Sequence, residues 1–249
     1  MNRIDKTKTT YETLFQTPLD VSKSNDPEFL NILQRLIFGE VFFVGHLPHT
    51  TREMITCTVL SVMQTLPQLK SHANAALNVG VSPLELREVV YQCAPFIGIP
   101  KTLNAINAID EVFTARNISL PLENQCFVED DKRYEEGLKI QQPLYGDEIK
   151  EHYAALPDHL GDQLARFLTS YCFGDFYTRP ALDIQTRELL ILCILTTLNA
   201  DKQIVAHGLG NIKVGNSLPT CYEALFQCLP YIGFPSTFNA INALMTIEQ

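Results

Sequence analysis

The stretch QCAPFIGIPKTLNAINA occupies residues 92–108, and QCLPYIGFPSTFNAINA occupies residues 227–243. The two stretches are identical at 12 of 17 positions and lie 135 residues apart (227 − 92 = 135). Such internal similarity at a constant spacing is typical of a duplicated structural unit. Further matches occur at the same offset without a gap: FGE at 38–40 with FGD at 173–175, TRE at 51–53 with TRE at 186–188, His72 with His207, and Gly80 with Gly215. We therefore predict two tandem domains, residues 1–125 and 126–249.

Each copy has the pattern of packed helices. The segments REMITCTVLSVMQTL (52–66) and RELLILCILTTLNA (187–200) are apolar on nearly every face, which indicates buried helices. The segment after each ends at a glycine, Gly80 or Gly215, suited to the left-handed position that follows a helix. Ser82-Pro83-Leu84-Glu85 supplies a capping box for another helix. Segments that alternate like strands are scarce, so the predicted fold class is all-α.

The repeated stretch itself is predicted to be structural. Pro95, Gly98 and Pro100 break one helix and redirect the chain. In the helix that follows, small residues lie on one face and allow close packing. We expect the amides of Asn104 and Asn107 to bond the carbonyl groups that the break exposes.

Composition excludes several classes of function. The 249 residues carry a formal charge of −9, from 19 basic and 28 acidic side chains, without a basic cluster. Nucleic acids and anionic membrane surfaces are therefore poor partners. The longest apolar run, 189–198, is shorter than a membrane span, and no export signal is visible at the start of the sequence. Seven cysteines without a CxxC motif fit core residues in a reducing compartment, so we expect a cytoplasmic location.

A family resemblance rests on FGDFYTRPALDIQTRELL (173–190), the histidine that follows it, and the repeated IGFP…NA sequence. This arrangement resembles the carboxymuconolactone decarboxylase family, which is related to the alkyl hydroperoxidase D proteins, over about residues 28–113 and 158–247. The first copy departs from the motif, because Val44-Gly45 stands where the second copy has Arg179-Pro180. The resemblance implies two tandem alkyl hydroperoxidase D-like helical units. It also implies a homo-oligomer, expected to be a trimer with a pseudo-sixfold arrangement.

The redox branch of this family places a CxxC directly before the histidine. Here the corresponding residues are Thr65 and Gln68 in the first copy, and Ala200 and Gln203 in the second. Peroxide reduction by a dithiol needs a pair of thiolates. A thiol-dependent peroxidase is therefore the less favoured alternative.

The resemblance implies a lyase that decarboxylates, or transfers a proton to, a small carboxylated lactone or related cyclic acid without a cofactor or metal. The predicted catalytic residues are His207, which returns a proton to carbon, and Glu188, which orients it. Arg187 and Arg179 are predicted to bind the substrate carboxylate. Glu53 and His72, with Arg52 for substrate binding, would form a parallel or decayed site.

Structural explanations of the same residues stay open. Glu53 and Glu188 stand near the start of a helix, where the helix dipole favours a carboxylate without any chemistry. The arginines can be salt-bridge partners, and a histidine in an apolar helix is often a core residue. The different-class alternative is therefore a non-catalytic ligand-binding or structural oligomer. A metal site at His46 and His49 is not favoured, because neither has a second-copy counterpart.

The spacing between glutamate and histidine suggests how they meet. In a plain helical hairpin His72 would lie opposite about residue 60, placing Glu53 about 10 Å further along the axis at 1.5 Å per residue. We therefore expect a bridging water, or a glutamate that serves the histidine of the other copy or of a neighbouring subunit.

Overall fold

The computed structural model describes residues 1–248, and within that range the chain forms helices and no strand. This confirms the all-α prediction. The first copy contains α1 (Arg3–Phe15), α2 (Pro27–Gly39), α3 (His49–Met63), α4 (Leu66–Asn78), α5 (Pro83–Tyr91), α6 (Ala94–Ile97) and α7 (Ile99–Ala115). The second contains α8 (Arg133–Tyr145), α9 (Glu148–His152), α10 (Leu160–Phe167), the π-helix η5 (Leu168–Tyr177), α11 (Ile184–Thr197), α12 (Asp201–Lys213) and α13 (Leu218–Met245).

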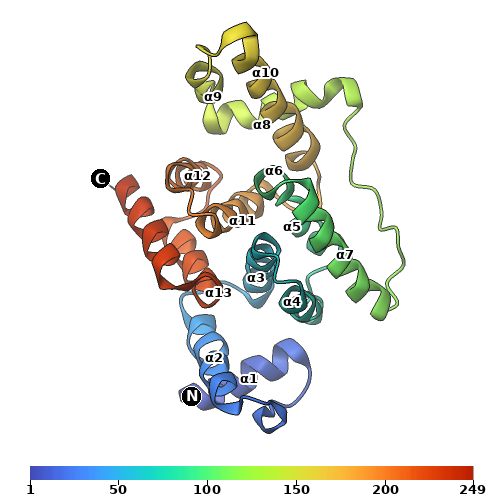
Figure 1. Cartoon of the computed structure of the whole chain (residues 1–249), viewed down its shortest axis with the longest axis vertical. Coiled ribbons are helices and arrows are strands. Elements are labelled where there is room, and N and C mark those ends of the chain that lie inside the picture. Colours follow the sequence, from blue (N-terminus) through green and yellow to red (C-terminus); the bar gives the residue numbers. More distant parts are fainter. Residues whose placement is uncertain (249) are drawn as a thin grey trace.

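The two copies share one core. Helices α3 and α11 lie side by side at the centre, and α13 packs against both (Figure 1). Their side chains are buried along most of each helix, as the continuous apolar patterns predict. One apolar cluster runs through both copies without interruption. The boundary between residues 125 and 126 stays a prediction.

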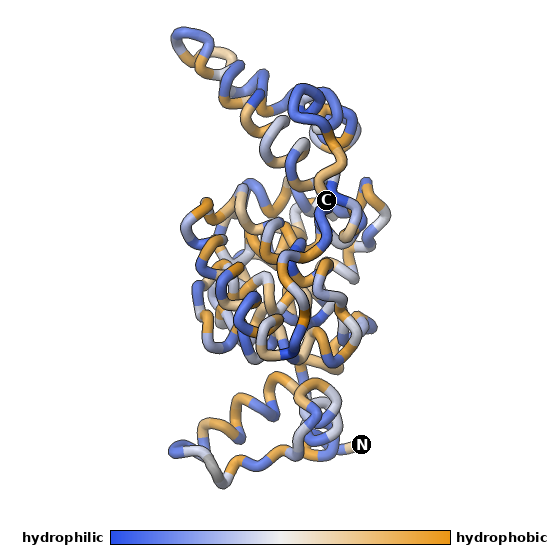
Figure 2. The backbone as a smooth tube through the Cα atoms, turned by 90° about the vertical axis from the view of Figure 1, so that its right-hand side faces the viewer, coloured by the Kyte–Doolittle hydropathy of each residue, from blue (hydrophilic) through white to orange (hydrophobic). Residues whose placement is uncertain are grey.

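Two helical arms extend from this centre. Helices α1 and α2 form one arm, and α8, α9 and α10 form the other, at opposite ends of the molecule (Figures 1 and 2). The glycines of the FGE and FGD motifs allow the helices of each arm to approach closely. A Cβ on Gly39 would lie 2.8 Å from the Arg3 carbonyl oxygen, and one on Gly174 would lie 2.3 Å from that of Arg133. The duplicated glycine is therefore required by packing.

The predicted helix ends are largely confirmed. Gly80 and Gly215 have φ angles of 102° and 97°, and the capping box at Ser82 and Glu85 is complete. The chain breaks at Gly98 and at its counterpart Gly233, which interrupts the long helix α13.

The prediction for the asparagines is wrong for Asn104, whose amide donates to the Gln64 side chain at 2.9 Å. The carbonyls at the breaks instead accept from two threonine hydroxyls. Thr102 Oγ1 lies 3.0 Å from the Gly98 oxygen, and Thr237 Oγ1 lies 2.9 Å from the Gly233 oxygen. Both threonines are one turn past the break, so their short hydroxyls reach the carbonyl groups four residues earlier.

Two further features bear on the sequence predictions. None of the helices in the described part of the chain has the length and apolar character needed to span a bilayer. All seven thiols are free; Cys126, between the two copies, is exposed, and the other six are buried.

Candidate active site

Each copy joins its own glutamate and histidine directly. Nδ1 of His207 on α12 lies 2.9 Å from Oε2 of Glu188 on α11. In the first copy Nδ1 of His72 on α4 lies 2.8 Å from Oε2 of Glu53 on α3. A carboxylate can only accept, so Nδ1 donates this bond, and Nε2 is the ring nitrogen that takes no part in it.

The expectation of a bridging water or a partner from the other copy is therefore wrong. The chain turns at Gln64 and Thr65, between α3 and α4. His72 consequently lies level with about residue 57, so Glu53 is only about 6 Å further along the axis at 1.5 Å per residue. The two side chains span that distance.

Both carboxylates are fully buried, whereas the histidine side chains differ in exposure. The side chain of His207 is 15% exposed and that of His72 is 9% exposed. Asn211 braces the second copy, because its amide donates to the backbone oxygens of Glu188 and His207 at 3.0 and 2.8 Å. The second imidazole is therefore held firmly and has the larger opening to solvent.

Two tyrosines complete the surroundings of Glu188. The Tyr145 hydroxyl, from α8, donates to Glu188 Oε2 at 2.6 Å and lies 2.8 Å from His207 Nδ1. The Tyr177 hydroxyl, from η5, donates to Oε1. Burial, with a contribution from the Glu188 charge, raises the pKa of both phenols above the usual value of 10. Both tyrosines therefore act as neutral donors to the carboxylate.

The first copy lacks these hydroxyls. At the 135-residue offset Tyr145 corresponds to Thr10, and Tyr177 corresponds to Phe42. Glu53 Oε1 is buried without a hydrogen-bond partner. The His72 ring makes edge contacts with Phe15 and Tyr231, with centroids 5.8 and 5.7 Å apart. Glu53 therefore has fewer hydrogen-bond donors than Glu188.

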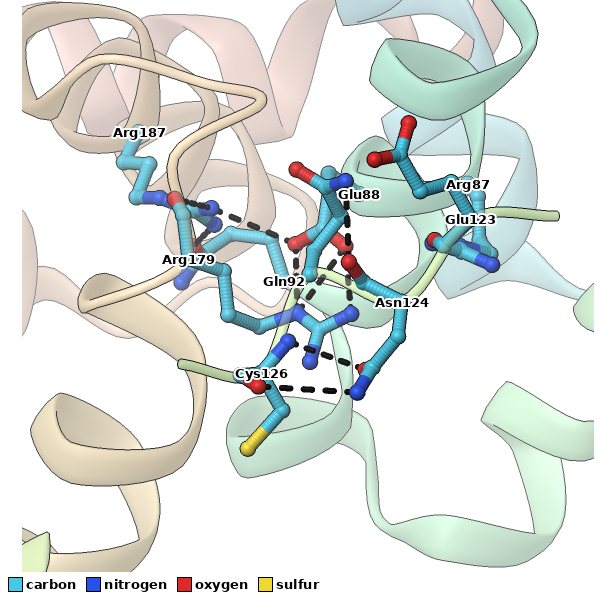
Figure 3. Close-up of polar contacts among 9 residues, drawn as sticks. Arg87, Glu88, Gln92, Glu123, Asn124, Cys126, Arg179 and Arg187 are labelled. Carbon is cyan, nitrogen blue, oxygen red and sulfur yellow. Dashed lines mark hydrogen bonds and ion pairs between the residues drawn. The ribbon is translucent and has the colours of Figure 1, made fainter. Parts of the chain in front are cut away.

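The arginines of the second copy point toward α5 of the first (Figure 3). Arg187 Nη1 donates to Gln92 Oε1 at 2.6 Å, and its Nη2 lies 3.2 Å from Glu88 Oε2. Arg179 Nε lies 2.9 Å from each Glu88 oxygen. Burial lowers the pKa of Arg187, and the nearby Glu88 opposes that shift. Glu88 is fully buried, so two guanidinium groups share one buried carboxylate between the copies.

Arg52 makes the reciprocal contact in the other direction. Its Nη1 donates to Gln227 Oε1 at 3.0 Å, and Gln227 corresponds to Gln92. Further donors reach backbone oxygens, including those of Leu47 at 3.0 Å and Val41 at 3.2 Å. Substrate binding by Arg52, Arg179 and Arg187 stays a prediction. Here the protein's own acceptors occupy most of their donors.

Sequence analysis missed several of these residues. Glu88 matches Glu223, and Gln92 matches Gln227, so the duplication itself could have indicated them. Tyr145 and Tyr177 have no tyrosine counterpart, and a search for repeated residues passes over them.

The described clefts are lined by residues other than the two candidate histidines. The largest cleft described, of about 930 Å³, lies beside α6, α8 and η5, and its lining includes Pro95, Arg133 and Tyr171. Neither His72 nor His207 lines any of the five clefts described. Within residues 1–248, no cluster of three or more histidine, cysteine or acidic side chains is placed to hold a metal ion. The His49 ring packs against Phe42.

Similarity to known proteins agrees with this helical, duplicated architecture. The carboxymuconolactone decarboxylase family matches residues 27–111 and 162–245, one region in each copy. The chain belongs to this family, in a tandem two-copy form.

Two relatives have related activities in their names. The chain is 34% identical to the 4-carboxymuconolactone decarboxylase of Acinetobacter baylyi over 86 residues, which is 34% of this chain and 64% of that protein. It is 26% identical to the nitrosuccinic acid decarboxylase of Metarhizium robertsii over 108 residues, which is 43% of this chain and 76% of that protein. The similarity therefore supports a decarboxylase-like family without defining a substrate.

Proposed function

We propose that the protein is a cofactor-independent carboxy-lyase acting on a small carboxylated lactone or related cyclic acid. The observation that carries the proposal is the buried Glu188–His207 pair, in which a fully enclosed carboxylate fixes one imidazole nitrogen and leaves the other available. Both relatives named above are decarboxylases, one of a carboxylated lactone and one of a nitro acid. Their names support decarboxylation as the reaction class. The choice of a lactone as the substrate class follows the name of the first relative.

In the proposed reaction, the carbon–carboxylate bond breaks and carbon dioxide leaves. The bonding electron pair remains on the substrate and is delocalised through its double bond and carbonyl group. The His207 imidazolium then gives its Nε2 proton to the carbanion, and Glu188 stabilises the imidazolium until that transfer. The imidazole regains a proton from water, so each turnover consumes one carboxylate and one proton and releases one carbon dioxide.

The arginines divide by exposure in this proposal. The side chain of Arg179 is 11% exposed, and it is the group proposed to contact the substrate carboxylate. Arg187 and Arg52 are 0% and 1% exposed, and they would hold the two copies in register. Glu53 and His72 would form a decayed site, because their surroundings lack the tyrosine donors.

The main alternative is a non-catalytic oligomer that binds a ligand or has a structural role. It is favoured by the five described clefts, none of which is lined by either histidine, and by the arginines already paired within the protein. The thiol peroxidase alternative is weaker, because burial raises the pKa of Cys93 and of Cys221 to about 12 and neither copy has a CxxC.

Assembly into a homotrimer with a pseudo-sixfold arrangement is part of the proposal, as is a cytoplasmic location. Large apolar side chains are exposed at matching positions of both copies, which favours contacts between chains. The matching pairs are Phe29 and Leu164, Ile32 and Phe167, Met63 and Leu198, Ile99 and Phe234, and Leu103 and Phe238. The mass in solution, measured by light scattering, tests the trimer; a monomer would contradict it.

The activity test is a screen for carbon dioxide release from carboxylated muconolactones and related acids, with His207→Ala and His72→Ala as a matched pair. We expect His207→Ala to lower kcat by at least about 100-fold, because it removes the proton donor. His72→Ala should stay within a few-fold of wild type. Equal losses would contradict the assignment to the second copy. A wild type that consumes no acid would favour the non-catalytic oligomer.

A further inference from the structure

We infer that Tyr145 and Tyr177 are positioning residues that set the proton affinity of the Glu188–His207 pair and so make the second copy the working one. The inference rests on the proposed function for its catalytic meaning, and on the contacts of the two hydroxyls for its physical content. Neither tyrosine has a hydrogen bond to Nε2 of His207: Tyr177 acts through Glu188, and Tyr145 acts through Glu188 and through Nδ1 of the imidazole.

The hydrogen bonds around Glu188 make it a carboxylate with its negative charge widely shared. Oε2 accepts from Tyr145 and from His207, and Oε1 accepts from Tyr177. Hydrogen bonds to a charged group are stronger than those between neutral groups. Three such donors stabilise the ionised form in a site that excludes water, where an unpartnered carboxylate would be costly.

Tyr145 also fixes the position of the imidazole. Its hydroxyl lies within hydrogen-bonding distance of both Glu188 Oε2 and His207 Nδ1, and the three groups form a closed triangle. The Tyr145 and His207 ring centroids are 5.0 Å apart, so the two rings also contact. The imidazole is held through both its nitrogen and its face.

Other titratable groups surround the pair. Cys172 and Tyr177 come from η5, Arg187 from α11, and Tyr145 from α8. Burial raises the pKa of the Cys172 thiol above its usual value, so it stays neutral. Arg187 pairs with Glu88, which it shares with Arg179. The two phenol hydroxyls are therefore the neighbouring donors that can be removed without adding or removing a charge.

In the first copy, the equivalent Glu53–His72 pair lacks the two tyrosine hydroxyls. With Thr10 and Phe42 at the two positions, Glu53 keeps its bond to His72 while its Oε1 has no partner. The distance between carboxylate and imidazole differs by only 0.1 Å between copies. The tyrosines thus change the electrostatic setting of the pair and leave its geometry intact.

The test uses the full-length chain with histidine labelled with ¹⁵N, in four forms: wild type, Tyr145→Phe, Tyr177→Phe and the double variant. The imidazole resonances of His207, identified by their loss in His207→Ala, are followed against pH. Removing a donor concentrates the charge on Glu188, so the pair holds its proton more tightly. We expect the pH midpoint of the His207 resonances to rise by about one unit or more per tyrosine.

Controls separate this effect from a general disturbance. Tyr171→Phe removes a hydroxyl from the same helix, η5, where the ring packs on Phe176 away from Glu188, and it should leave the midpoint unchanged. The His72 resonances should stay constant in every variant. Urea unfolding identifies any variant that fails to fold. A folded double variant with an unchanged pH midpoint for His207 would overturn the inference. So would two folded single variants, Tyr145→Phe and Tyr177→Phe, that both leave this midpoint unchanged.

Kinetics distinguish this inference from the proposed function. With a substrate in hand, the alkaline limb of the kcat/KM profile should move to higher pH in the tyrosine variants, since the active pair carries the proton to be given. If the wild type consumes no acid but the His207 midpoint still rises, the lyase proposal fails and the assignment of the tyrosines to this pair stands.

Discussion

The two copies preserve the same glutamate–histidine contact in different surroundings. Glu188 accepts from the hydroxyls of Tyr145 and Tyr177, and the Asn211 amide bonds its backbone oxygen. The side chain of His207 remains partly exposed to solvent. Around the first pair the protein places Phe15 and Tyr231 against the His72 ring, and one oxygen of Glu53 has no hydrogen-bond partner. A repeated residue pair is therefore insufficient evidence for a repeated activity, because the groups that set its chemistry lie at positions that have diverged.

The same divergence occurs at the contacts between copies. Glu88 is fully buried between Arg179 and Arg187, whereas its counterpart Glu223 is partly buried and accepts the backbone N–H groups of His46 and Leu47 at 2.7 and 3.1 Å. The difference follows from Val44, which stands where the second copy has Arg179. Glu88 pairs directly with two guanidinium groups, whereas Glu223 accepts backbone N–H groups, with the Arg52 charge nearby.

The largest expected difference comes from removing these two carboxylates. Glu88→Ala leaves two guanidinium groups without their anion, one of them fully buried, and should lower the free energy of unfolding by about 3–5 kcal/mol. Glu223→Ala, the matched control, exposes two N–H groups that water can reach and should cost about 1 kcal/mol. Urea unfolding followed by helical circular dichroism measures both. Equal losses would show that the two interfaces carry similar energy.

A smaller effect is expected from restoring one hydroxyl to the first copy. Phe42→Tyr places a phenol at the position of Tyr177, where it can donate to the unpartnered Glu53 Oε1. We expect the free energy of unfolding to rise by about 1 kcal/mol, since a buried acceptor gains a donor. Phe38→Tyr is the control, because it adds a hydroxyl to the same aromatic cluster. A loss of stability in both variants would show that the first site cannot accept the tyrosine arrangement.

The smallest effect concerns thiols, which neither copy is predicted to use. Iodoacetamide near pH 8 should modify Cys126 in the native protein and all seven cysteines after denaturation, as counted by mass spectrometry. Burial raises the pKa of Cys57 and Cys93 above the usual value, and a hydrogen bond with Cys228, together with burial, raises that of Cys193. The thiolate is the reactive form. Rapid native modification of a cysteine inside either copy would contradict this and revive the thiol alternative.

Much of this fold could be predicted from the sequence because its signals are local or repeated. Continuous apolar segments, the glycines after helices and the capping box each depend on neighbouring residues. The constant offset also identified the Glu–His pairs. The distance within each pair was not predictable, because a shift of a few residues in the position of the turn moves the partners by several ångströms.

Contacts between copies were beyond the reach of that reasoning. Arg187 bonds Glu88 and Gln92, which lie about a hundred residues earlier in the chain. The spacing of residues along the chain does not predict contacts between such distant positions. The sequence did not indicate Tyr145 as a site residue for a different reason. Tyr145 belongs to α8, an arm helix whose polar sequence resembles a linker. Residues that have diverged between copies are hard to detect by their repetition and easy to detect by their contacts.

The reciprocal contacts between arginine and glutamine have a consequence for how the two halves of the chain fold. Each half buries a guanidinium group whose amide partner, Gln92 or Gln227, is encoded in the other half. Halves produced separately would therefore each lack the amide that their buried guanidinium group bonds, and we expect them to fold fully only when they are combined.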